Sequence, residues 1–102
     1  MKEYNKLVRD FIPEIIENNN QKCKINILSD NDFLFFAEKK LDEEVMEYHQ
    51  DQTAEELVDL IEIIYAIANA KGISETQLNK LRIEKQKERG AFKKKILLVS
   101  VE

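Results

Sequence analysis

Two helix-start patterns in the middle of this 102-residue chain constrain its fold more than any other feature. Thr53 precedes Glu56 by three residues, and Ser74 precedes Gln77 by the same interval. In a capping box, the hydroxyl of the first residue accepts a hydrogen bond from the backbone N–H of the later residue. The side chain of the later residue in turn accepts one from the backbone N–H of the first. The two patterns therefore predict where two consecutive helices begin.

Two further helices are expected earlier in the chain. Ser29 or Asp30 begins a long one, and Asp10 caps a short one that has Pro13 in its first turn. The chain has two glycines and one proline, so the turn residues typical of β-rich folds are nearly absent. We predict a single all-α domain over residues 1–102, with helices over about residues 10–17, 29–50, 53–72 and 74–89.

Two apolar runs outside these helices favour extended structure. Residues 24–28 alternate partly at period two, and residues 96–101 are rich in branched apolar side chains. A short β pairing between the two runs is a minor expectation beside the helices.

The chain shows no feature of a membrane or secreted protein. No stretch approaches the roughly 20 apolar residues that span a bilayer, and the N-terminus lacks the apolar core of a signal peptide. A cytoplasmic location with no membrane partner is expected. The single Cys23 and single His49 are too few for a soft-ligand zinc site, so a bound metal ion would need oxygen ligands.

Charge is strongly segregated along the sequence. Residues 38–62 carry ten acids against two lysines, a net charge of −8, and residues 80–95 carry eight bases against two acids, a net charge of +6. An acidic cluster that faces a basic one suits a metal ion and a polyphosphate. The net charge of −4 for the whole chain, and the lack of interleaved aromatic residues in the run Lys93-Lys94-Lys95, argue against a nucleic-acid partner.

The helical turn of about 100° per residue places four acids at or inside apolar stripes. On the second predicted helix, Glu44 lies inside the stripe and Glu47 just beyond one edge of it. On the third, Glu56 lies inside the stripe and Asp59 at its border. A carboxylate in an apolar stripe is costly unless a cation compensates it. Each pair is spaced by three residues, so the pairs can converge across a helical hairpin and hold Mg²⁺, or Mn²⁺ in its place.

The apolar arc of the third predicted helix is unusually wide, at about 220°. One neighbouring helix does not cover such an arc. The helix is therefore either very central or covered by a second subunit, and we favour a homodimer whose interface includes it. The sequence does not distinguish a dimer from a tetramer.

Three blocks in order carry a family resemblance. They are E-x-x-E at 44–47 followed by E-x-x-D at 56–59, the run from Tyr4 to Asp10 with Ile12-Pro13-Glu14-Ile15-Ile16, and the run from Glu84 to Gly90 with Phe92. Together they resemble the MazG-like nucleotide pyrophosphohydrolase superfamily, related in fold to phosphoribosyl-ATP pyrophosphohydrolase, in its small single-domain branch. The chain departs from the usual pattern at Phe11, where relatives have lysine, and at Ala91, where they have a second glycine.

The resemblance implies a MazG-like helical bundle that hydrolyses a nucleoside triphosphate, or a related nucleotide, to the monophosphate and pyrophosphate. The four acids would be its catalytic metal ligands. Basic side chains would bind the phosphates, and the candidates are Lys6, Arg9, Lys40, Lys87, Arg89 and Lys93. Of these, Lys40 is also expected to pair with Glu44 or Glu47 along its own helix.

Two other interpretations of the acids compete with metal binding. Acid-rich helix faces are usually only solvated surfaces, and Glu56 has a rival role as the third residue of the capping box that Thr53 opens. The alternative function is a catalytically weak helical module that senses a nucleotide or binds a protein partner. Metal-dependent release of pyrophosphate would separate the enzyme from the module.

Overall fold

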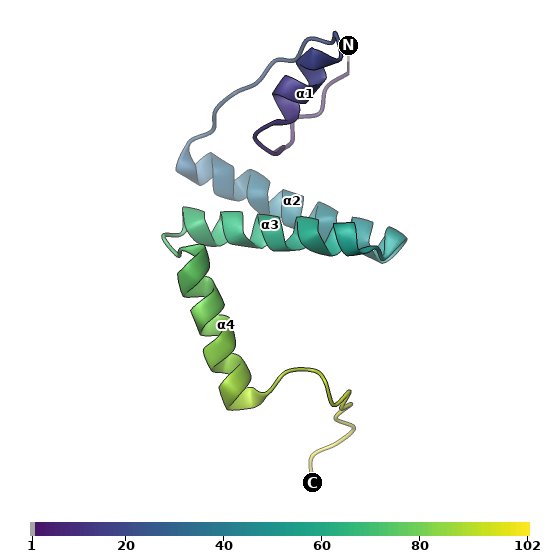
Figure 1. The fold of residues 1–102 in the computed structure, drawn as a ribbon, viewed down its shortest axis with the longest axis vertical. Helices are drawn as coiled ribbons and strands as arrows, with labels where there is room; N and C mark the ends of the chain where they lie inside the picture. The colour runs from purple at the N-terminus through teal and green to yellow at the C-terminus, as the bar shows by residue number, and fades with distance from the viewer. Residues whose placement is uncertain (1) are drawn as a thin grey trace.

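Four helices make up the regular structure of the chain, in a computed structural model that describes residues 2–102 (Figure 1). They are α1 (Ile12–Asn18), α2 (Asp30–Asp51), α3 (Ala54–Ala70) and α4 (Glu75–Arg89). The predicted all-α fold is confirmed. The molecule is elongated, with extents of 61 × 32 × 23 Å, and α2 and α3 lie side by side as a hairpin in its middle.

Hydroxyl caps begin the three long helices, as the sequence predicts. Ser29, Thr53 and Ser74 each accept a backbone N–H three residues later, at 3.2, 3.4 and 3.1 Å. At Ser74 the box is complete, because the Gln77 side chain accepts the Ser74 N–H at 2.9 Å. At Thr53 only the hydroxyl half forms within residues 2–102, so the Glu56 carboxylate is not used as a cap.

The predicted cap of the first helix is wrong. α1 begins at Ile12, and its N-cap is Phe11, whose side chain makes no capping hydrogen bond. Pro13 lies in the first turn, where its missing N–H costs nothing, so α1 forms without the acid at position 10 as its cap.

Gln52 shapes the turn between α2 and α3. It is the C-cap of α2 and adopts the left-handed conformation with φ 53°, and its N–H donates to the Tyr48 carbonyl at 2.7 Å. Thr53, the next residue, is already the N-cap of α3. This short connection folds α3 back along α2 and brings the start of α3 beside the second half of α2.

Gly72 ends α3 and redirects the chain into α4. Its φ is +83°, and the N–H of Ile73 donates to the Ala68 carbonyl at 2.9 Å while that of Gly72 donates to Asn69 at 3.0 Å. This is the Schellman arrangement, for which glycine is favoured because it has no Cβ. Of the other helices within residues 2–102, α4 packs only against α3, and it runs away from α2 (Figure 1).

The expected β pairing is not formed. No strand occurs between residues 2 and 102, and the runs 24–28 and 96–101 lie toward opposite ends of the molecule (Figure 1). The second run follows α4, which carries it away from the N-terminal half. Its side chains are exposed, and Leu97 is an example at 85%.

The core of the single chain is small. Its buried apolar residues are Ala37, Ile63 and Ala68, and no large side chain is fully buried among the described residues. None of the helices in residues 2–102 combines the length and the apolar character that a bilayer crossing requires.

Candidate metal centre

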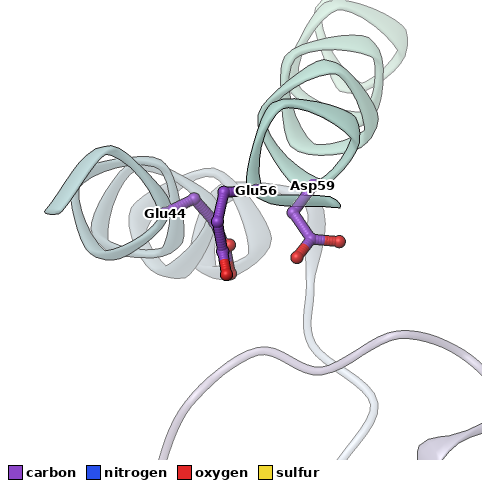
Figure 2. Close-up of side chains that lie close together, drawn as sticks. All are labelled: Glu44, Glu56 and Asp59. Atoms are coloured by element: carbon purple, nitrogen blue, oxygen red, sulfur yellow. The ribbon is translucent and has the colours of Figure 1, made fainter. Parts of the chain in front are cut away.

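Three of the four predicted acids meet where the start of α3 lies beside α2. Glu44, Glu56 and Asp59 each offer a carboxylate oxygen, and the three oxygens lie within 4.8 Å of one another. Figure 2 shows the three side chains directed to one side of the α2–α3 hairpin. We call these three residues the acidic cluster.

Glu44 is the buried member of the acidic cluster. The residue is 5% exposed, and its Oε1 contacts the Lys40 ammonium at 3.3 Å, whereas its Oε2 is buried with no hydrogen-bond partner among the described residues. Burial raises the pKa of Glu44, and the hydrogen bond with Lys40 opposes this shift. The inward orientation predicted from the helix angles is confirmed, and so is the Lys40–Glu44 pair.

Glu56 lies in a strongly acidic environment. Loss of hydration raises its pKa first, and the negative charges of Asp51, Asp59 and Glu44 raise it further. The nearby charges that act on this group are thus all carboxylates. A cation bound here would lower the pKa of Glu56, because it stabilises the charged form of the carboxylate.

Glu47 lies outside the acidic cluster, although it is half-buried on α2, three residues beyond Glu44. Its negative charge nevertheless raises the pKa of Glu44 and that of Lys6. The structure therefore places Glu47 in the same electrostatic environment but not in the group of three converging oxygens.

Two cations from the N-terminal segment reach this site. The Arg9 guanidinium contacts Asp59 Oδ1 at 2.7 Å, and the Lys6 ammonium contacts Glu43 Oε1 at 3.0 Å. The Lys6–Glu43 hydrogen bond also raises the pKa of Lys6. The structure thus brings three of the six predicted phosphate-binding residues to the acids: these two and Lys40.

The other three predicted phosphate-binding residues lie elsewhere in the chain. Lys87 and Arg89 belong to the last turn of α4 and Lys93 follows it, all are exposed, and none has an ion pair within the described part of the chain. α4 runs away from α2 (Figure 1), and among the described residues no base of the block 80–95 forms an ion pair with an acid of the block 38–62. The expected pairing of the two blocks is therefore not formed within the described part of the chain.

Sequence reasoning missed two acids that belong to the surroundings of the site. Glu43 holds Lys6 and lies 4.0 Å from Lys40, and Asp51 raises the pKa of Glu56. Glu43 falls outside the apolar stripe of its helix, and its partner is 37 residues away in sequence. The position of Asp51 just before the turn was a usable signal, because a short connection places it near the start of the next helix.

The donor atoms fit a hard divalent cation. All are carboxylate oxygens, the type that Mg²⁺ and Mn²⁺ prefer, and one buried oxygen, Glu44 Oε2, has no partner among the described residues. Glu44, Glu56 and Asp59 could hold the ion, with Glu47 close enough to add charge.

Comparisons with known protein families, with curated proteins and with solved structures find no match to this chain.

Proposed function

We propose that the chain is a Mg²⁺-dependent nucleotide pyrophosphohydrolase that converts a nucleoside triphosphate, or a related nucleotide, to the monophosphate and pyrophosphate. The observation that carries the proposal is the buried carboxylate of Glu44, which converges with those of Glu56 and Asp59 and whose Oε2 has no partner among the described residues. Lys40 contacts only Oε1, and a buried carboxylate oxygen without a partner is costly. The resemblance of the three sequence blocks to MazG-like enzymes supports the same activity.

In this proposal Glu44, Glu56 and Asp59 hold the metal ion, and Glu47 adds negative charge beside them. Mn²⁺ could replace Mg²⁺, because both accept hard oxygen ligands. When bound, the ion neutralises phosphate oxygens and activates a water molecule for attack at phosphorus.

Cations at the edge of the acidic cluster orient the substrate. Arg9 and Lys6 are half-exposed, and they contact Asp59 of the acidic cluster and the neighbouring Glu43, which supports a role for both in binding phosphate. Arginine is suited to bind two phosphate oxygens at once. A substrate drawn from free nucleotides agrees with the cytoplasmic location expected from the sequence.

We also propose that a second copy of the chain covers the outer face of α3. Leu57, Val58, Ile61 and Ile64 are between 44% and 56% exposed there, and Ile61 and Ile64 line an open hollow of about 400 Å³ between α3 and α4. Charge complementarity identifies the occupant: the bases of residues 80–95 form no ion pair with the acids of residues 38–62 within the described part of the chain, and a second copy supplies the complementary block. Lys87, Arg89 and Lys93 would then contact the phosphates or acids of the partner.

The decisive experiment measures pyrophosphate release from a panel of ordinary, deoxy and modified nucleoside triphosphates, with and without Mg²⁺. We expect metal-dependent release by the wild type and its loss in Asp59→Ala, which removes a ligand from the acidic cluster. Glu55→Gln is the matched control, since this exposed acid lies in the first turn of α3 outside the cluster. It should keep the wild-type rate.

If no nucleotide of the panel gives pyrophosphate release but nucleotides bind tightly, the chain would be a nucleotide-sensing module and not an enzyme. Full activity of Asp59→Ala would remove the acidic cluster from the reaction.

A further inference from the structure

The N-terminal segment, residues 2–10, is joined to the acidic site by ion pairs rather than by helix packing. Arg9 contacts Asp59 across 50 residues of sequence, and Lys6 contacts Glu43 across 37. No helix lies within residues 2–10, and α1, which follows, packs against none of the other helices between residues 2 and 102. We call residues 2–10 the strap.

The two anchors of the strap differ in their relation to the acidic cluster. Asp59 belongs to the cluster, so Arg9 and a metal ion would compete for the same carboxylate. Glu43 does not belong to the cluster, so a metal ion bound there would not compete with the Lys6–Glu43 ion pair.

The Arg9–Asp59 pair is suited to exchange. The distance of 2.7 Å is short, but the two side chains are 52% and 38% exposed, and solvent weakens ion pairs of this kind. A divalent cation carries twice the charge and would also compensate the buried Glu44 carboxylate, for which no contact with Arg9 is found among the described residues.

We propose that Arg9 fastens the strap to Asp59 in the metal-free protein, that a divalent cation displaces it, and that the released guanidinium then binds a phosphate of the nucleotide. The inference rests on the proposed function and adds an order of events to it. Lys6 keeps the strap beside the site after release, so Arg9 stays within reach of the substrate.

The simpler alternative is a static ion pair in which Arg9 orients Asp59 for the metal ion. The two interpretations predict opposite changes in metal affinity when Arg9 is removed. If Arg9 competes with the cation, its removal strengthens metal binding; if Arg9 positions the carboxylate, its removal weakens metal binding.

The first test is calorimetric titration of Mn²⁺ alone into the wild type, Arg9→Gln and Lys2→Gln at constant ionic strength. We expect Arg9→Gln to bind Mn²⁺ about two- to fivefold more tightly, the range that corresponds to losing one exposed ion pair. Lys2→Gln is the control, because Lys2 lies in the strap, contacts the Tyr4 ring and has no acidic partner among the described residues. Its affinity should equal that of the wild type.

The second test follows tryptic cleavage of the wild type after Lys6 and Arg9, with cleavage after exposed Lys71 as the internal reference. We expect Mg²⁺ to accelerate cleavage after Arg9 relative to Lys71, and Mg²⁺ with an α,β-methylene nucleoside triphosphate to slow it again. A metal ion that merely stabilises the whole fold would slow cleavage at every site.

The outcomes separate the strap from the proposed function. Suppose that Asp59→Ala loses Mn²⁺ binding but Arg9→Gln binds Mn²⁺ as tightly as the wild type or more weakly. This result would overturn the proposed displacement of Arg9 and leave the proposed function standing. The same conclusion follows if Mg²⁺ slows cleavage after Arg9 or leaves it unchanged. Absence of Mn²⁺ binding in both the wild type and Arg9→Gln overturns both.

Discussion

The inner and outer sides of the α2–α3 hairpin invert the usual distribution of polarity. On the inner side a carboxylate, Glu44, is 5% exposed, while on the outer side of α3 Val58 is 56% exposed and Ile61 51%. Folded chains normally bury the apolar group and expose the charged one. Each side therefore lacks a different component. On the inner side, Lys40 contacts only Oε1 of Glu44, and Oε2 has no partner among the described residues. The outer side lacks an apolar surface to cover it.

The largest effect is expected from neutralising the inner side. Glu44→Gln keeps the shape of the side chain but removes the charge that would bind the cation, so metal-dependent pyrophosphate release should fall by roughly 100-fold or more. Pyrophosphate assays and Mn²⁺ calorimetry measure the loss, and thermal unfolding checks that the variant folds. Glu38→Gln, an exposed acid on the same helix, is the control. If Glu44→Gln were as active as the wild type, the buried carboxylate would have no catalytic role.

A smaller effect is expected from charging the outer side. Ile61→Glu places a carboxylate in the middle of the apolar face, and burying it at an interface is unfavourable, so the dissociation constant of the dimer should rise at least about tenfold. Light scattering over a concentration series measures this shift. Asn69→Glu is the matched control, because it adds the same charge at an exposed position near the C-terminal end of α3, away from the middle of the apolar face. A wild type that stays monomeric at all concentrations would contradict the proposed second copy.

The smallest effect is expected from pH, and it again concerns the inner side. The pKa of Glu44 in the folded protein is raised from the usual 4.5, so the metal-free folded state binds a proton more readily than the unfolded state does. The free energy of unfolding should therefore increase, relative to that of Glu44→Gln, as the pH falls through the raised pKa toward 4.5. Denaturant titrations without metal at several pH values measure the difference. A difference that stays constant with pH would show that Glu44 is not destabilised by its surroundings.

Local features of the sequence predicted the helices well. The hydroxyl caps at Ser29, Thr53 and Ser74 lie where helix-start patterns indicated, because a cap depends only on residues within one turn. The inward position of Glu44 was also predictable, since it follows from the helical period.

Features that depend on distant residues were not predictable in the same way. The pairs Arg9–Asp59 and Lys6–Glu43 join segments that no periodicity connects. The direction of α4 is set by the turn at Gly72, and this direction separates the basic block from the acids. The expected β pairing was wrong for the same reason, since propensity identified two extended runs but not their places in space.

Only Gln52 and Thr53 connect α2 to α3, so this connection has no spare residue with which to absorb a change in length. One inserted residue would turn α3 by about 100° about its axis and carry Glu56 away from Glu44. Any descendant of this sequence that keeps the three carboxylates together must therefore also keep the count of residues between them, whatever substitutions its surface accumulates.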